Sequence, residues 1–174
     1  MAYKIDVSIV IKNHLKTIVN DNTKKPDFRD IVIFGFFPVV VAVILCAFKL
    51  FINKDFIASM ICGLAIYVGL SLNLIILLFE IVQRKETSAF KREFARDFIA
   101  NVCFSILLSI ATITTSLFTL LFTLPAAPAI ATKGVVVGNY VTNGLFYYLL
   151  THMLLIILLL VKRLYYQLLE QIES

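Results

Sequence analysis

The sequence predicts an all-α integral membrane protein with four transmembrane helices and with both termini in the cytosol. Four apolar stretches occupy more than half of the 174 residues. Each has about the 20 helical residues needed to cross a hydrocarbon core of roughly 30 Å. Of the 16 Lys and Arg residues, 13 flank the same side of these stretches, and the positive-inside rule places that side in the cytosol. Apolar residues make up 60% of the chain, more than a soluble domain of this size buries.

One membrane domain, residues 27–163, is expected between a cytosolic leader at 1–26 and a cytosolic tail at 164–174. The four spans and their two longer connections are predicted as follows: spans near 31–51, 56–82, 98–124 and 144–161, a basic cytosolic loop at 83–97, and an outer loop at 125–143. The continuous apolar runs differ from the short alternating segments of a transmembrane barrel.

The leader is predicted to contain an amphipathic helix over about Val7–Val19 that lies in the membrane interface. Its apolar residues recur at helical spacing: Val7, Ile11, Leu15 and Ile18. Apolar and polar residues also alternate through residues 3–12, which is typical of a strand. An exposed strand edge could pair with a partner, so the sequence leaves both structures open and favours the helix.

The first two spans are expected to form an antiparallel hairpin. Asp27 can cap the start of the first helix, and Pro38 should bend it. A short polar turn at 53–55 leads into the second span. Within that span, Asn73 and Glu80 fall near one face together with small residues, which suit close helix contacts.

The polar side chains of Asn73 and Glu80 are expected to be satisfied in different ways. The amide of Asn73 lies deep in the bilayer and must find a hydrogen bond, because an unsatisfied amide is unfavourable there. Glu80 lies near the cytosolic border and is expected to extend toward water or to pair with Arg84.

The loop at 83–97 is the most charged part of the chain and is expected to be a short cytosolic helix leading into the third span. Two interpretations are open: a solvated topology signal, or a docking surface for a cytosolic partner. The residues predicted for such a surface come from this loop and from the start of the tail: Phe90, Lys91, Arg92, Phe94, Arg96, Lys162 and Arg163.

The third span carries a polar stripe whose members are three or four residues apart, so they share one helix face. The stripe consists of Asn101, Ser105, Ser109, Thr112, Ser116, Thr119 and Thr123. Small hydroxyl residues allow helices to approach closely and to form interhelical hydrogen bonds. The same stripe could instead line a wetted path for ions. Packing is favoured, and pore lining remains the alternative.

The outer loop and the fourth span contain two further unusual features. The loop is nearly uncharged, which fits entry into the outer leaflet, a fourth span that begins near Val135, or packing against other subunits. His152 lies near the middle of that span, and an ionisable residue at this depth is a candidate functional site. The alternative is a neutral imidazole that bonds to a neighbouring helix.

The sequence gives no indication of an enzyme. It contains no catalytic triad spacing, Gly-rich phosphate loop or HExxH motif. The two histidines and three cysteines lack metal-ligand spacing, so neither a metal nor a cofactor is expected. The net charge of +5 comes from cations beside the spans. These fit contact with anionic lipid rather than direct binding of nucleic acid.

The layout resembles the membrane subunits of bacterial anti-phage systems, most closely the membrane component of the Kiwa system. The features that carry the resemblance are the cytosolic leader, the basic loop Gln83–Asp97 and the short tail Lys162–Ser174. The resemblance implies a plasma-membrane sensor of phage attack that recruits a cytosolic, nucleic-acid-binding protein. A homo-oligomer, with a tetramer preferred, would bury the polar stripes. The alternative function is a small oligomeric channel or pore-forming effector.

Overall fold

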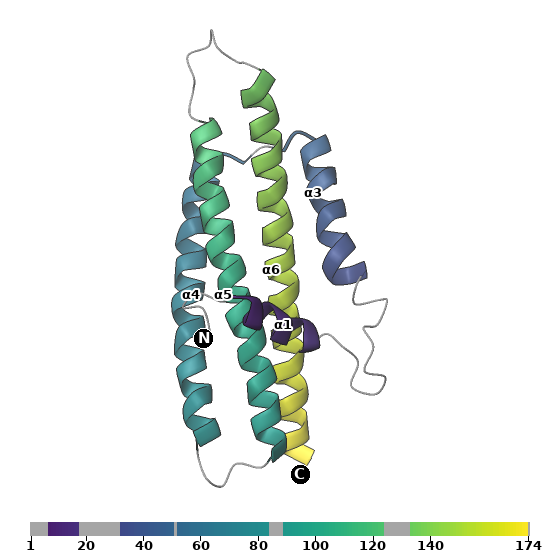
Figure 1. Ribbon diagram of the computed structural model, residues 1–174, viewed down its shortest axis with the longest axis vertical. Coiled ribbons are helices and arrows are strands. Elements are labelled where there is room, and N and C mark those ends of the chain that lie inside the picture. The colour runs from purple at the N-terminus through teal and green to yellow at the C-terminus, as the bar shows by residue number, and fades with distance from the viewer. Residues whose placement is uncertain (1–6, 18–31, 51, 84–88, 124–132, 174) are drawn as a thin grey trace.

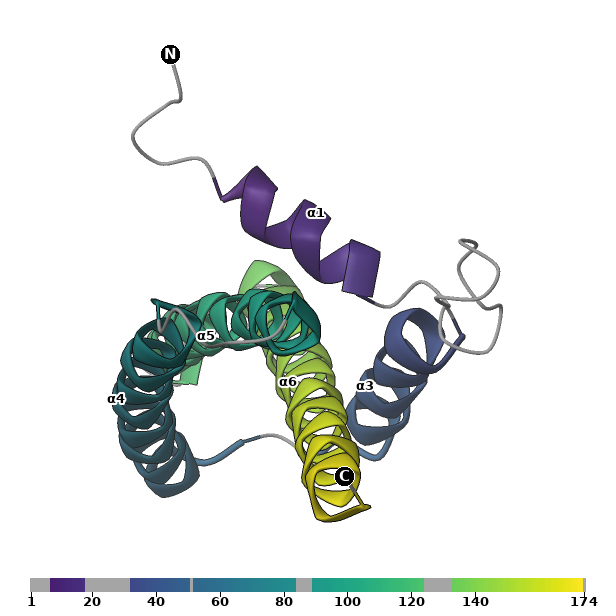
Figure 2. The ribbon, with the colours of Figure 1, turned by 90° about the horizontal axis from the view of Figure 1, so that it is seen from below.

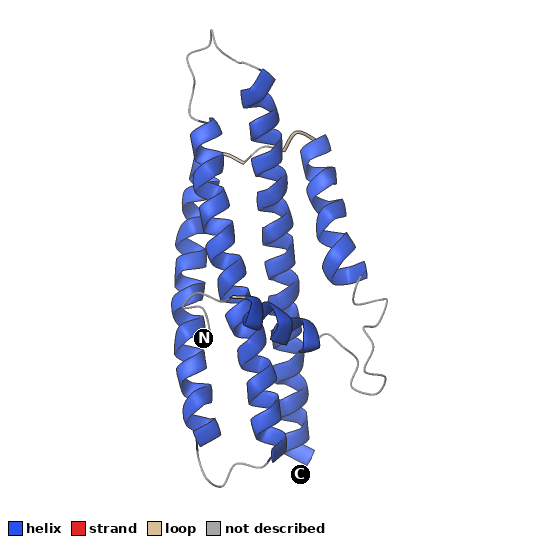
Figure 3. Ribbon diagram, in the orientation of Figure 1, coloured by secondary structure: helices blue, strands red, loops and turns tan. Residues whose placement is uncertain are grey.

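The computed structural model describes residues 7–17, 32–50, 52–83, 89–123 and 133–173. Within these ranges the chain forms helices and no strand (Figure 3). The helices, labelled in Figure 1, are α1 (Ser8–Thr17), the π-helical turn η1 (Val32–Phe36) that runs into α3 (Phe37–Ala47), α4 (Lys54–Gln83), α5 (Ala89–Thr123) and α6 (Lys133–Glu173). The predicted helix in the leader is therefore confirmed over Ser8–Thr17, and the strand alternative is wrong for residues 8–12.

Three helices in the described part of the chain are long and apolar enough to cross a membrane. Their candidate spans are Lys54–Glu80, Phe94–Leu120 and Val137–Tyr166. The apolar helix Val32–Ala47 is shorter and extends about 24 Å at 1.5 Å per residue. The chain is thus an all-helical protein with three helices suited to a bilayer.

The helices extend beyond the predicted spans. α6 begins at Lys133, so residues 133–143 of the predicted outer loop are helical. This agrees with the alternative in which the last helix begins near Val135. The same helix continues through the predicted tail to Glu173. α5 begins at Ala89, inside the predicted loop at 83–97. Polar residues can continue the helices at these ends, because each residue added to an established helix gains a backbone hydrogen bond without burial of an apolar face.

The four long helical elements form a curved row in the order α4, α5, α6 and α3, which we call the helix row (Figure 2). α5 packs between α4 and α6, and α3 packs on the other side of α6. The first two predicted spans therefore do not form a hairpin with each other, because α3 and α4 lie at opposite ends of the row.

The connection between α3 and α4 explains this arrangement. Lys49 adopts a left-handed conformation (φ 54°) after α3, and the next residues cross α6. There the hydroxyl of Tyr147 donates to the carbonyl of Leu50 at 2.5 Å. The backbone N–H of Ile52 donates to Oδ1 of the buried Asn143 at 3.1 Å. α6 thus holds the connection and separates α3 from α4.

Two apolar clusters hold the row together. Near the end where α5 begins, Phe98 and Val102 of α5 pack against Ile156 and Leu160 of α6. Near the opposite end, buried side chains of the α3–α4 connection, α4 and α6 form the second cluster: Ile52, Ile57 and Phe146. The outer surface of the helices is largely apolar and exposed, as expected for a surface that contacts lipid.

Candidate functional site: a polar contact between α1 and the helix row

α1 lies across α5 and approaches α6, so it crosses the helix row and does not run along it (Figures 1 and 2). Its contact face contains Asn13, His14 and Thr17. His14 is only 1% exposed. A polar side chain is therefore the most deeply buried residue of this helix.

Three of the four apolar residues that predicted an amphipathic helix do not face the row, and the fourth, Ile18, lies outside the described residues. Val7, Ile11 and Leu15 are all exposed and lie on a neighbouring side of α1, because residues spaced by four share a helix face. The basic residues Lys12 and Lys16 are also exposed. α1 therefore presents to the row a mainly polar side, which also contains the half-buried Val10, and it has an apolar side that suits the hydrocarbon boundary of a bilayer.

Asn101 of α5 is the centre of the contact. Its Oδ1 lies 2.6 Å from Nδ1 of His14 and 2.8 Å from Oγ1 of Thr17. Its Nδ2 donates to the carbonyl of Asp97 at 3.0 Å, which fixes the orientation of the amide. Because Oδ1 only accepts, the proton of the neutral imidazole lies on Nδ1.

α6 contributes Arg163, whose guanidinium donates to the backbone carbonyl of Thr17. This carbonyl belongs to the last turn of α1, where unpaired carbonyls favour a cation. The hydroxyl of Thr17 also lies 2.7 Å from the carbonyl of His14, so its single proton is shared between two acceptors. α1 is thus held by α5 and α6 at the same time.

Burial lowers the pKa of His14 from 6.5 to about 4. The hydrogen bond to Asn101 acts in the opposite direction, and the nearby His152 and Arg163 lower the pKa further, because each disfavours an additional positive charge. His14 is therefore neutral at pH 7, and protonation opposes its burial.

Phe104 connects the two histidines. The ring of His14 stacks on Phe104 with centroids 3.9 Å apart and an interplanar angle of 11°. His152 contacts the same phenyl ring edge-on at 6.0 Å and also meets Phe34 and Tyr148. Its Nδ1 is buried and has no hydrogen-bond partner among the described residues. His152 therefore lies in an aromatic enclosure, next to the α1 contact.

The polar stripe of α5 is buried within the chain. Asn101, Ser105, Ser109, Thr112, Ser116 and Thr119 are each 0% exposed; the side chain of Thr123 lies outside the described residues. The hydroxyls donate to carbonyls of α5 itself, for example Ser116 to Thr112 at 2.7 Å. Besides the bonds of Asn101 to α1, two contacts among the described residues reach neighbouring helices: Tyr67 of α4 donates to Ser105 at 2.8 Å, and Ser109 donates to Sδ of Met153 at 3.4 Å. The stripe thus occupies the contacts of α5 with α4 and α6.

The small-residue face of α4 is exposed. Gly63 and Gly69 have no neighbouring atom within 4 Å of a built Cβ. Asn73 and Glu80 are exposed on this side of the helix. No described residue forms a hydrogen bond with Asn73. Within one copy of the chain, no described helix therefore packs on this face.

The described residues among those predicted for docking differ in their surroundings. Phe94 packs against the first apolar cluster and lies 5.7 Å from Phe98, measured between ring centroids. Arg163 belongs to the α1 contact, and Arg92 and Arg96 line a groove described below. Lys162 is exposed, with its ammonium 6.0 Å from the ring centroid of Tyr166. The side chains of Phe90 and Lys91 lie outside the described residues.

The described part of the chain has no group of three His, Cys, Asp or Glu residues that could hold a metal ion.

The contact between His14 and Asn101 is not among the sequence predictions, in which Asn101 is only a member of the stripe. The one signal in the sequence that could have indicated this contact is that Asn101 is the only amide in a stripe of hydroxyl residues.

Comparisons of the chain with protein-family models, with curated proteins and with solved structures found no match.

Proposed function

We propose that this chain is a non-enzymatic sensor and scaffold subunit of the bacterial plasma membrane, which self-associates and recruits a cytosolic protein partner. The observation that carries the proposal is the attachment of α1 to both α5 and α6 through Asn101 and Arg163. A role in an anti-phage defence complex with a nucleic-acid-binding partner is proposed from the layout resemblance alone.

The proposed topology has four spans and cytosolic termini. η1 and α3 form the remaining span, since the segment Val32–Ala47 is apolar throughout and α3 packs beside α6. The distribution of 13 of 16 cations on one side supports this orientation.

The attachment of α1 provides a way to transmit a change in the membrane. α1 accepts a hydrogen bond from Arg163 of α6 and donates others to Asn101 of α5. A displacement of α6 relative to α5 therefore breaks the bonds of α1 to at least one of these helices. Partial loss leaves buried polar groups unsatisfied, which favours release of the whole helix. α1 can therefore adopt attached and released states whose equilibrium depends on the packing of α5 and α6.

The exposed face of α4 supports self-association. An unpaired amide such as Asn73 is unfavourable in hydrocarbon, and the open backbone at Gly63 and Gly69 permits close approach of another helix. A second copy that packs here would provide hydrogen-bond partners for Asn73. The proposed tetramer is one closed form of this assembly.

The same face supports the second candidate function, a small oligomeric channel. In a ring of copies, Asn73 and Glu80 could line the axis, and Ser59 lies on the exposed side of the same helix. The stripe of α5 supports this function less, since its hydroxyls are buried within one chain and bonded to their own helix.

The proposed partner-docking surface consists of α1 and the end of α6. Lys162, Tyr165 and Tyr166 are exposed there. Tyrosine is enriched at protein interfaces because one ring combines apolar area with a hydrogen-bonding hydroxyl.

The test is site-specific photo-crosslinking in the native host, with a photoreactive phenylalanine analogue at position 166 and a control at the exposed Leu158. A scaffold predicts a reproducible protein adduct at 166 and none at 158. The abundance of the adduct should change in an Asn101→Leu variant that inserts normally. Adducts only to copies of this chain, together with ion flux from proteoliposomes, would support the channel and contradict the scaffold.

A further inference from the structure

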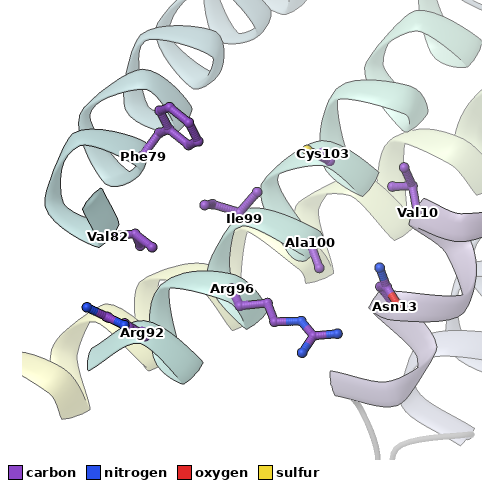
Figure 4. A pocket seen from close by; sticks show the side chains of 9 residues that line it. All are labelled: Val10, Asn13, Phe79, Val82, Arg92, Arg96, Ile99, Ala100 and Cys103. Atoms are coloured by element: carbon purple, nitrogen blue, oxygen red, sulfur yellow. The ribbon is translucent and has the colours of Figure 1, made fainter. Parts of the chain in front are cut away.

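A groove of about 480 Å³ lies between α1, α4 and α5 (Figure 4). Its apolar walls come from all three helices: Val10 of α1, Phe79 and Val82 of α4, and Ile99, Ala100 and Cys103 of α5. Its polar lining consists of Arg92, Arg96 and Asn13. The groove is thus mainly apolar, with two cations along one part of its wall.

The position of the groove spans two depths of a bilayer. Phe79 lies within the candidate span Lys54–Glu80, and Ile99 lies within Phe94–Leu120. Arg92 precedes the second of these spans by two residues. The walls therefore extend from the hydrocarbon region to the level where arginine side chains meet headgroups.

The two arginines lie on one side of α5. Arg92 and Arg96 are four residues apart, so they emerge from neighbouring positions on the helix surface, and both are exposed. Arg96 extends toward Asn13 of α1, and Arg92 extends away from it (Figure 4). No carboxylate within the described residues pairs with either guanidinium. Two cations that no described carboxylate pairs with favour the binding of an anion, and guanidinium groups bind phosphate oxygens through paired hydrogen bonds.

We infer that this groove binds a phospholipid with an anionic headgroup. One acyl chain lies against Phe79, Val82 and Ile99, and the phosphate lies beside Arg96, which extends toward the amide of Asn13, while Arg92 adds a second positive charge farther along the wall (Figure 4). The apolar walls favour a lipid over a soluble phosphate, and the unpaired cations favour an anionic over a zwitterionic headgroup. Because α1 forms one wall, the bound lipid also favours the attached state of α1.

The test uses the full chain, purified in detergent, stripped of lipid and titrated with phosphatidylglycerol or phosphatidylcholine under native mass spectrometry. The wild-type protein should bind phosphatidylglycerol at least tenfold more tightly than phosphatidylcholine. Each basic residue near a membrane surface strengthens the attraction to anionic lipid about fivefold, so an Arg92→Gln/Arg96→Gln variant should lose roughly 25-fold of this affinity. Its affinity for phosphatidylcholine should change little.

A matched control is Lys12→Gln/Lys16→Gln, which removes the same charge from exposed positions of α1 that do not line the groove. This control should keep the headgroup preference of the wild type. Equal affinities of the wild type for the two lipids, or an equal loss of affinity in both double variants, would overturn the proposal.

A second variant tests the apolar walls. Ala100→Trp fills the groove and keeps both arginines, so it should weaken the binding of both lipids by at least tenfold. Unchanged binding in a monodisperse, helical Ala100→Trp protein would contradict the assignment of the site. Competition with soluble glycerol phosphate separates the two sources of phosphate: if it displaces phosphatidylglycerol at comparable concentrations, the site binds an anion and not a lipid.

Discussion

Two asparagines at equivalent depth have opposite surroundings in this molecule. Asn101 lies seven residues inside the candidate span Phe94–Leu120, and Asn73 lies seven residues inside the same end of Lys54–Glu80. Asn101 is fully buried and bonded to α1, whereas Asn73 is exposed. Helical spacing in the sequence thus identifies a polar face of a helix, but it does not identify which other helix packs on that face. One amide holds the chain's own N-terminal helix, and the other is available to a second copy.

The largest expected effect is a pH-dependent release of α1 from Asn101. The pKa of His14 is about 4 when the helix is attached and returns to about 6.5 on release. Proton uptake therefore favours the released state as pH falls below 6.5. The attachment is strongest above this pH and loses about 3 kcal/mol as pH falls toward 4. Hydrogen exchange of the amides of residues 8–17, measured from pH 7.5 to 5, should show progressive loss of protection.

His14→Gln is the control for this prediction, because a glutamine side chain can donate to Asn101 but does not titrate in this range. Its protection, corrected for the intrinsic exchange rate, should not depend on pH. His152 and Arg163 also face the contact, so a His152→Gln variant separates titration of the second histidine. A wild-type pH dependence that persists in His14→Gln would contradict the role of His14.

The second prediction tests the buried stripe that begins at Asn101. Thr112→Leu introduces a larger side chain into a fully buried position, and such overpacking typically lowers the free energy of unfolding by about 1–3 kcal/mol. Thr114 is the matched control: it lies on the same helix, forms the same type of bond to its own helix and is exposed. Unfolding in mixed detergent micelles should show a loss for Thr112→Leu and little change for Thr114→Leu. Equal effects would contradict the packing of the stripe.

The smallest effect is expected on the side of Asn73. An interhelical hydrogen bond in a membrane contributes about 0.6 kcal/mol, so Asn73→Leu should weaken self-association about threefold for each bond lost. The exposed Leu158 of α6 provides a control position, where Leu158→Ala should leave self-association unchanged. Single-molecule photobleaching in lipid vesicles measures the assembly. Unchanged association of Asn73→Leu would remove this face from the oligomer interface.

The sequence predicts the helices well because long apolar runs must become helical in lipid. It predicts their neighbours poorly, since apolar faces that meet lipid and apolar faces that meet another helix have the same composition. The separation of α3 from α4 depends on Asn143 and Tyr147, which bond to the connection more than 90 residues away in the chain. The same reasoning applies to the candidate site.

His14 and Asn101 are 87 residues apart, and no periodicity relates a short leader helix to a membrane span. The apolar pattern of α1 correctly predicts a helix, yet its apolar side is exposed and the polar side makes the contact. Burial of a histidine in this helix is a property of the tertiary structure, so it could be found only once α1 was placed against α5.

The most direct test of the account measures the distance between α1 and α6. Spin labels at the exposed positions 12 and 164, in a chain with Cys46, Cys62 and Cys103 replaced by Ser or Ala, report whether α1 is attached. In lipid nanodiscs at pH 7.5, double electron–electron resonance should give one narrow distance distribution. Asn101→Leu should broaden this distribution and shift it to longer distances, whereas Asn73→Leu should leave it unchanged. A narrow, unshifted distribution in Asn101→Leu would contradict the claim that Asn101 holds the N-terminal helix.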